Sequence, residues 1–238
     1  MERTLEKLAG GEHVTIVALG DSTTEITFYT QGHMNWLQYL EEALIETYGI
    51  GCCTVINVGR GGDTFGSVGN RLDRDVIRFS PDLVVVSLGI NDALGKLQRL
   101  PVFKEEVKAV VHAIRARCGS EILIRTPNPV VTVRGMPPPP EQPEAGRVWE
   151  APDRPVGEYA RALAAVAREL ECPVVDHYRM WEEAVFRKTR NPDPPGLWPR
   201  MGDAVHPGPM GHVAFFREIA PCFEVPTHFP WEEGLSEQ

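Results

Sequence analysis

The segment Asp82-Leu-Val-Val-Val-Ser-Leu88 is an apolar, β-branched run between Ser80-Pro81 and Gly89. Such a run, bounded by turn residues, predicts a β-strand. A second run, His13-Val-Thr-Ile-Val-Ala-Leu19, stops at Gly20-Asp21-Ser22 and is typical of a strand that is buried on both faces. Shorter runs predict three more strands, at residues 53–57, 121–125 and 173–176.

Apolar residues at helical spacing separate these strands. They predict helices over residues 36–48, 68–79, 103–116 and 156–170. Strands that alternate with helices are joined by right-handed crossover connections, which pair the strands in parallel. The sequence therefore predicts an α/β protein, a three-layer α/β/α sandwich with a five-stranded parallel sheet, formed as a single domain over residues 1–238.

The composition is that of an ordinary globular protein. The 238 residues are 42% hydrophobic and 24% charged, which excludes collagen-like, coiled-coil and disordered classes. A formal net charge of −9 disfavours nucleic acid and anionic membrane surfaces as partners. We expect a neutral or weakly polar small molecule as the ligand, and the sequence leaves a homo-oligomer open.

The N-terminal residues MERTLEKLAGGEH carry charges where a signal peptide needs an apolar stretch, and no apolar run is long enough to span a membrane. These features predict a cytoplasmic protein, although a removed export signal would leave no trace. The five cysteines match neither a zinc site nor a disulfide framework, so we expect thiols in a reducing compartment: Cys52, Cys53, Cys118, Cys172 and Cys222.

One segment has no helix or strand period. Residues 127–155 are rich in proline, including Pro137 to Pro140, which predicts a long loop insertion after the fourth strand. Loops that leave the carboxyl ends of strands surround the ligand site in open α/β sheets. Two interpretations stay open: a surface excursion or subunit contact, and a wall or lid over a substrate site.

Four short polar segments stand where the predicted topology places loops at one edge of the sheet. They are Gly20-Asp21-Ser22 after the first strand, Gly61-Gly62-Asp63 after the second, Gly89-Ile-Asn91-Asp92 after the third, and Asp203-Ala-Val-His206-Pro207 near the C-terminus. Each is a common turn composition when taken alone. Because parallel strands end at the same edge, we expect all four to converge on one crevice.

These four blocks resemble those of the SGNH (GDSL-type) hydrolase superfamily, esterases and lipases named for a Ser, a Gly, an Asn and a His on four sequence blocks. The resemblance covers about residues 13–220. It implies a flavodoxin-like sheet and hydrolysis of acyl esters with no metal and no cofactor. Thr23 stands where the GDSL pattern has Leu, which argues against a lipase more than against an esterase.

The residue types are also those that nucleophilic catalysis needs. A serine hydroxyl is a weak nucleophile until a base takes its proton, and the base needs a third group that fixes its tautomer. His206 fits the base, and Asp203, three residues earlier, can accept a bond from its Nδ1–H. We therefore predict Ser22, His206 and Asp203 as catalytic residues; the alternatives are a surface histidine and a turn or N-cap carboxylate.

Attack on an ester also creates an oxyanion that needs preorganised donors. We predict the backbone amides of Ser22 and Gly62 and the side-chain amide of Asn91 as this oxyanion hole; the alternative is that Gly62 and Asn91 serve only their turns. Asp21, Asn57 and Asp63 are expected to brace these turns.

Other residues are candidates for contact with substrate: Arg60, Asp92, His177 and Trp149. For His177, packing is the alternative. The segment Gly59-Arg-Gly-Gly-Asp-Thr64 is similar to a dinucleotide fingerprint but lacks its third glycine and the acid after the next strand. A metal site of Asp203, His206 and His212 fits by ligand type alone, yet we expect His212 to cap or pack in the last helix.

The resulting hypothesis is a serine ester hydrolase that acts through an acyl-enzyme on short-chain or acetyl esters, with acetylated sugars as the first candidate. Two alternatives stay open. One is a thioesterase or lysophospholipase of the same superfamily, and the other is a non-catalytic flavodoxin-like binding module.

Overall fold

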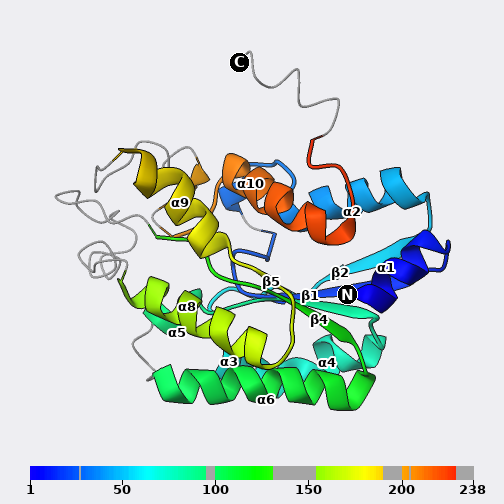
Figure 1. The fold of residues 1–238 in the computed structure, drawn as a ribbon, viewed down its shortest axis with the longest axis horizontal. Helices are drawn as coiled ribbons and strands as arrows, with labels where there is room; N and C mark the ends of the chain where they lie inside the picture. Colours follow the sequence, from blue (N-terminus) through cyan, green and yellow to red (C-terminus); the bar gives the residue numbers. More distant parts are fainter. Residues whose placement is uncertain (27, 95–99, 131–153, 190–199, 204, 229–238) are drawn as a thin grey trace.

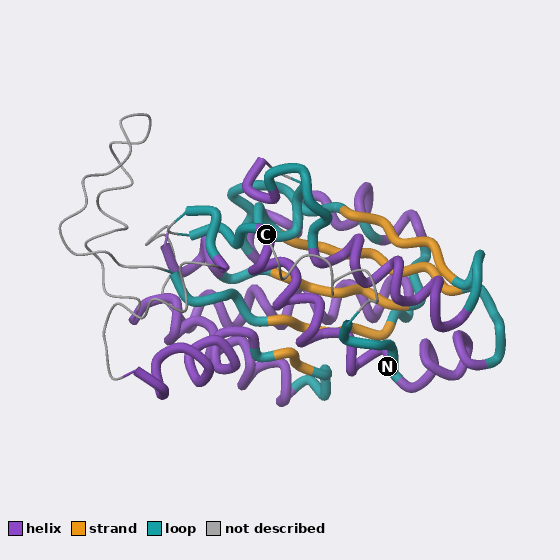
Figure 2. The backbone as a smooth tube through the Cα atoms, turned by 90° about the horizontal axis from the view of Figure 1, so that it is seen from above, coloured by secondary structure: helices purple, strands orange, loops and turns teal. Residues whose placement is uncertain are grey.

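The sheet has five strands, all paired in parallel, in the order β2-β1-β3-β4-β5 (Figure 1). The computed structural model describes residues 1–26, 28–94, 100–130, 154–189, 200–203 and 205–228. The strands are β1 (Val14–Gly20), β2 (Cys53–Asn57), β3 (Leu83–Ser87), β4 (Glu121–Arg125) and β5 (Val174–Val175). They lie side by side in Figure 2. The predicted α/β class and the five-stranded parallel sheet are confirmed.

Helices cover both faces of this sheet (Figure 1). One face carries α2 (Trp36–Tyr48), α9 (His177–Thr189) and α10 (Pro209–Ile219). The other carries α3 (Phe65–Val68), α4 (Leu72–Asp75), α5 (Ile90–Leu94), α6 (Leu100–Cys118) and α8 (Arg154–Glu169). The short α1 (Glu2–Ala9) packs through Leu8 on the same side as α2 and α10. The three layers are those that the alternation of strands and helices predicts.

Each face of the sheet has its own hydrophobic core, because successive strand residues point to opposite faces. In β3, Val84 and Val86 pack against α6 and α8, whereas Leu83 and Val85 pack against α2 and α10. All five β3 residues are buried. This two-sided burial explains why the run at 82–88 is continuously apolar instead of alternating.

The region between β2 and β3 differs from the prediction of one helix over 68–79. A capping box of Thr64 and Ser67 starts α3 early, and the chain then passes through a 3-10 turn at Gly69–Arg71 before α4. Glycine is a poor helix former, which favours an interruption of the helix at Gly69. The apolar residues keep their helical spacing across the interruption, because a 3-10 turn and an α-helical turn differ by less than one residue. The helices α1 and α9 were also not predicted.

The carboxyl ends of the central strands lie at one edge. Gly20 is in register with Ser87, and Ser87 with Arg125. The segments that follow β1, β2 and β3 therefore start beside one another. None of the helices in the described ranges is both long and apolar enough to cross a bilayer.

Candidate active site

Ser22 sits in a tight turn that follows β1 directly. The buried carboxylate of Asp21 accepts hydrogen bonds from the backbone amide and the hydroxyl of Thr23, both at 2.9 Å. From the outer side, the Thr24 carbonyl accepts bonds from the side-chain amides of Asn57 (2.8 Å) and Asn35 (3.1 Å). Asp21 and Asn57 thus brace this turn, and Ser22 is left partly exposed.

A chain of hydrogen bonds runs from Ser22 through His206 to Asp203. His206 Nε2 lies 3.0 Å from Ser22 Oγ, and His206 Nδ1 lies 2.8 Å from Asp203 Oδ2. Asp203 Oδ1 accepts two further bonds, from the backbone amides of Val205 and His206. Burial alone would raise the pKa of Asp203, but the bonds and charge of His206 outweigh it and lower this pKa below its ordinary value.

The imidazole is held by the compact turn that carries it. The Gly202 amide donates to the His206 carbonyl at 2.7 Å, and Met201 and Pro207 form an isolated antiparallel bridge. At the start of α10, a Cβ on Gly211 would collide with the Arg200 carbonyl, so only glycine lets this turn approach the helix so closely. The structure therefore fixes His206 by its backbone as well as by its side chain.

The segment after β2 is fastened to the Ser22 turn at several points. The Arg60 amide donates to the Gly20 carbonyl at 3.0 Å, and the Gly61 amide donates to Glu25 Oε2 at 2.7 Å. Gly62 has a φ of +83°, a conformation that suits glycine. Within the described part of the chain, the amides of Ser22 and Gly62 have no acceptor, which leaves both free for a ligand.

Asn91 and Asp92 lie in the first turn of α5, which begins almost directly after β3. Asn91 Nδ2 donates one hydrogen bond to the Asp63 carbonyl at 3.0 Å, so its second N–H stays available. Asp92 is buried and accepts from the Phe65 amide. These bonds join the segment after β3 to the segment that carries Gly62.

Arg71 was not among the residues predicted for the site. Its guanidinium pairs with both Asp63 and Asp75 and also donates to the carbonyls of Val58 and Gly20. It is buried and ties the end of β1 to the segments on either side of Gly62. The only sequence feature that could have indicated Arg71 is its position eight residues after Asp63, and such a spacing is common on helices.

A second buried arginine lies under the site. Arg125, at the end of β4, has its guanidinium over the rings of Trp36 (4.3 Å) and Phe215 (4.1 Å). Burial lowers the pKa of Arg125 to about 9 and raises that of Asp21 to about 6, although the charge of Arg125 and the bonds from Thr23 oppose the rise at Asp21. The charge of Arg125 thus reaches the carboxylate beneath the Ser22 turn.

Two of the predicted substrate contacts are corrected by the structure. His177 starts α9, is fully buried, and its Nδ1 lies 2.5 Å from Glu218 Oε2, so it packs between α9 and α10. Asp92 is only 1% exposed and is turned toward Phe65. Both carry polar side chains next to strand ends, a pattern that does not distinguish a residue that faces ligand from one that holds a neighbouring loop.

Arg60, Trp149 and His212 are the predicted residues that remain. Arg60 is exposed next to Gly61, and Trp149 lies outside the described residues, as does most of the proline-rich segment. His212 is buried, and its Nδ1 accepts from the Trp36 amide at 3.4 Å, so it caps α2 from α10. The described residues contain no group of three or more His, Cys, Asp or Glu side chains that could hold a metal ion.

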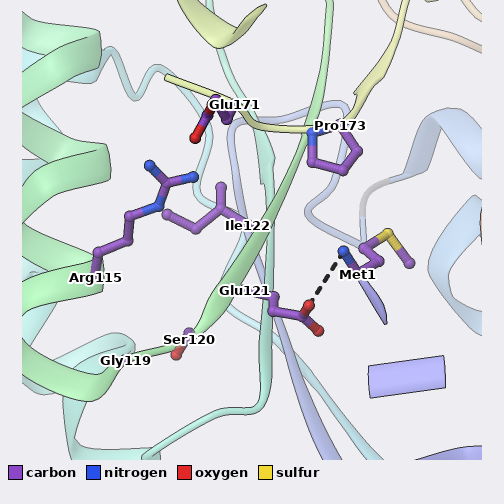
Figure 3. Close-up of a pocket in the computed structure, with 8 residues that line it drawn as sticks. All are labelled: Met1, Arg115, Gly119, Ser120, Glu121, Ile122, Glu171 and Pro173. Carbon is purple, nitrogen blue, oxygen red and sulfur yellow. Dashed lines mark ion pairs between the residues drawn. The ribbon is translucent and has the colours of Figure 1, made fainter. Parts of the chain in front are cut away.

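A separate pocket of about 390 Å³ lies near the start of β4 (Figure 3). The strands begin at this end of the sheet, whereas Ser22 follows the carboxyl end of β1. Its wall includes Arg115, Glu171 and Glu121, and the Met1 ammonium pairs with Glu121 at 3.2 Å. Glu121 also accepts bonds from Thr4, so this carboxylate fixes α1. The pocket is remote from Ser22 and contains none of the predicted site residues.

Comparisons with known proteins agree on one family. The model of the GDSL-like Lipase/Acylhydrolase family matches residues 18–214. An acetylxylan esterase of Geobacillus stearothermophilus is 29% identical over 202 residues, which are 79% of this chain and 80% of that protein.

Solved structures share the fold. The crystal structure of an acetylxylan esterase from Geobacillus stearothermophilus gives a TM-score of 0.68 at 20% identity, over 91% of this chain and 97% of that chain. A lipase/acylhydrolase from Enterococcus faecalis gives 0.65 at 22% identity, over 91% and 99%.

Proposed function

Because the chain belongs to the GDSL-like lipase/acylhydrolase family and is a carboxylic ester hydrolase, we propose that Ser22 is its nucleophile and that it removes acetyl groups from carbohydrate esters through an acyl-enzyme. The observation that carries the proposal is the pair of bonds on one imidazole, 3.0 Å to Ser22 Oγ and 2.8 Å to Asp203 Oδ2. This geometry lets one ring accept a proton from serine while a carboxylate holds its other nitrogen.

In the first half of the reaction, Ser22 Oγ attacks the ester carbonyl and its proton passes to His206 Nε2. Asp203 stabilises the imidazolium, and its lowered pKa keeps it ionised throughout this step. The tetrahedral intermediate then collapses as His206 gives the proton to the leaving alcohol. The acyl group stays on Ser22, and water repeats the cycle with His206 as base.

The amides of Ser22 and Gly62 and the second N–H of Asn91 supply the oxyanion hole in this proposal. All three belong to segments that the structure fastens to one another, through Gly61 to Glu25 and through Asn91 to Asp63. Donors that are fixed in advance need no reorganisation as the charge develops, and each is worth about 10²- to 10³-fold in rate.

The substrate class rests on the relatives. The acetylxylan esterase that matches over most of both chains acts on an acetylated polysaccharide, as its name states, and the net charge of −9 disfavours anionic polymers as substrates. A single domain over residues 1–238, a cytoplasmic location and a homo-oligomer stay predictions, as does contact of Arg60 and Trp149 with substrate.

Labelling with a fluorophosphonate tests the nucleophile. We expect the wild-type protein and Ser80→Ala, which changes an exposed serine before β3, to be labelled, and Ser22→Ala to lose labelling and at least about 10³-fold in kcat. Labelling of Ser22→Ala at the wild-type rate would reject the assignment.

Acyl preference tests the substrate class. Rates on p-nitrophenyl esters should fall steeply from the C2 to the C8 ester, and acetate should be released from an acetylated xylo-oligosaccharide. A maximum at C8 or longer would instead favour a lipase-like or lysophospholipase activity.

A further inference from the structure

Tyr29 lies against the imidazole of His206, a contact that no sequence pattern predicted. It belongs to a single 3-10 turn, η1 (Phe28–Thr30), between the Ser22 turn and α2. The two rings are stacked, with centroids 4.0 Å apart and planes inclined by 9°. A ring that covers one face of the imidazole restricts its rotation away from Ser22.

The hydroxyl of Tyr29 reaches the other member of the pair. Burial raises the pKa of Tyr29 to about 12, and the charge of Asp203 and a side-chain hydrogen bond to it add to this rise. Asp203 therefore receives bonds from the His206 imidazole, from two backbone amides and from Tyr29. One side chain thus interacts with both His206 and Asp203.

The backbone is shaped to allow this contact. A Cβ placed on Gly202 would lie 3.2 Å from Tyr29 Cβ and 3.3 Å from the Tyr29 carbonyl oxygen, which is tighter than ordinary packing. Gly202 directly precedes Asp203 and donates to the His206 carbonyl. The turn that carries Asp203 and His206 therefore packs closely on the backbone and side chain of Tyr29.

We propose that Tyr29 is a positioning residue for the proposed catalytic pair, in which its ring holds and stabilises the imidazolium of His206 and its hydroxyl orients Asp203. The proposal rests on the function proposed above. It predicts two effects of opposite sign. Loss of the hydroxyl leaves Asp203 with more uncompensated charge, which favours the imidazolium, whereas loss of the ring removes a π-face that favours the imidazolium.

The acid side of the kcat/KM profile measures both effects, because only a neutral imidazole can accept the proton. The titratable groups near His206 are Asp203 on its own turn, Tyr29 on η1, Asp21 after β1 and His212 on α10. Asp21 and His212 are unchanged in Tyr29 variants, so a difference between two variants isolates Tyr29.

The experiment compares wild type, Tyr29→Phe and Tyr29→Leu on p-nitrophenyl acetate from pH 5 to pH 9. Tyr48→Phe is the control, because it removes another hydroxyl bond, to the Phe223 carbonyl, far from Ser22. We expect the midpoint of the acid limb to move to higher pH in Tyr29→Phe. In Tyr29→Leu it should lie about half a pH unit below that of Tyr29→Phe.

The rate constants give a second readout. In Tyr29→Leu, kcat should fall about tenfold with little change in KM, since a misplaced catalytic group slows chemistry more than binding. Tyr48→Phe should match wild type in both midpoint and kcat. If Tyr29→Leu does not fold, the upward shift in Tyr29→Phe alone decides.

Three results would overturn the proposal. These are a wild-type midpoint in both variants, a lower kcat with no shift, which marks a merely structural role, and a change confined to KM, which marks a contact with substrate. Failure of the proposed function is distinguishable, because it shows as fluorophosphonate labelling that survives Ser22→Ala, whatever Tyr29 does.

Discussion

The carboxylate of Asp92 accepts a hydrogen bond from the backbone amide of Phe65 at 3.1 Å, and thereby ties α5 to the start of α3. The same carboxylate is 1% exposed, and within the described residues its second oxygen has no partner. Burial, followed in importance by the opposing bond from Phe65, leaves the pKa of Asp92 raised to about 7. This group therefore links the geometry of the site to the pH dependence of stability.

The first prediction concerns Asp92→Asn, which keeps the acceptor and cannot ionise. The folded-state pKa of Asp92, about 7, exceeds its ordinary value of 3.8, so its contribution to stability is full below pH 3.8 and is lost as the pH rises to 7. Relative to the variant, the wild type should lose up to about 1.4 kcal/mol of stability per pH unit across this window. Urea unfolding at pH 5, 6, 7 and 8 measures the difference, and parallel curves would refute the assignment.

The second prediction separates transition-state stabilisation from binding at Asn91. Asn91→Ala should lower kcat by about 10²- to 10³-fold and leave KM nearly unchanged, because the oxyanion exists only along the reaction path. Asn70→Ala, an exposed asparagine beyond α3, should retain wild-type kinetics. A rise in KM without a loss of kcat would instead make Asn91 a substrate-holding residue.

The third prediction tests Gly62 against a glycine of the same conformation. Gly62 and Gly51 both have a φ of +83°, and a Cβ on either meets no atom within 4 Å. Alanine should therefore destabilise both variants similarly, by about 1 kcal/mol. Only Gly62→Ala should also reduce kcat, because the strain reorients an amide of the proposed oxyanion hole. Equal kinetics in the two variants would exclude the Gly62 amide from that role.

The fourth prediction concerns the two arginines that pair with Asp75. Arg71→Lys removes the fork that reaches Asp63, Val58 and Gly20 from a buried position, so we expect a stability loss of about 3 kcal/mol and a lower kcat. Arg74→Lys changes an ion pair whose arginine is 64% exposed, and its effect should be close to zero. Thermal unfolding and p-nitrophenyl acetate turnover measure both, and equal effects would contradict the bracing role.

Much of the fold could be predicted because each strand is a short apolar run with clear ends. The strands at 53–57 and 121–125 match the observed bounds, as does the helix at 36–48, which Asn35 caps and Gly49 ends. The prediction of one helix over 68–79 was wrong, because apolar spacing does not reveal where a helix is interrupted. Helix α9 was not predicted because its first residue, His177, directly follows the predicted strand at 173–176 and was considered only as a substrate contact or a packing residue.

The site residues fall into two groups, those that a local sequence pattern predicts and those that it does not. Ser22, His206 and Asp203 stand in recognisable blocks, and the structure brings their side chains within hydrogen-bond distance of one another. No sequence pattern around Tyr29, Arg71 or Arg125 marks these residues as part of the site. Their importance comes from contacts with segments that are distant in the chain, such as the 4.0 Å stacking of Tyr29 on His206, and only the folded arrangement shows these contacts.

The serine and the imidazole that meet at 3.0 Å are 184 positions apart, one after the first strand and the other just before the last α-helix of the described chain. In the proposed mechanism neither group can act until the sheet between them has assembled and the final helix has docked. The recovery of hydrolytic activity after dilution from denaturant therefore reports a late step of refolding. It should lag behind the return of the far-ultraviolet circular dichroism signal, which reports secondary structure and does not require these two side chains to meet.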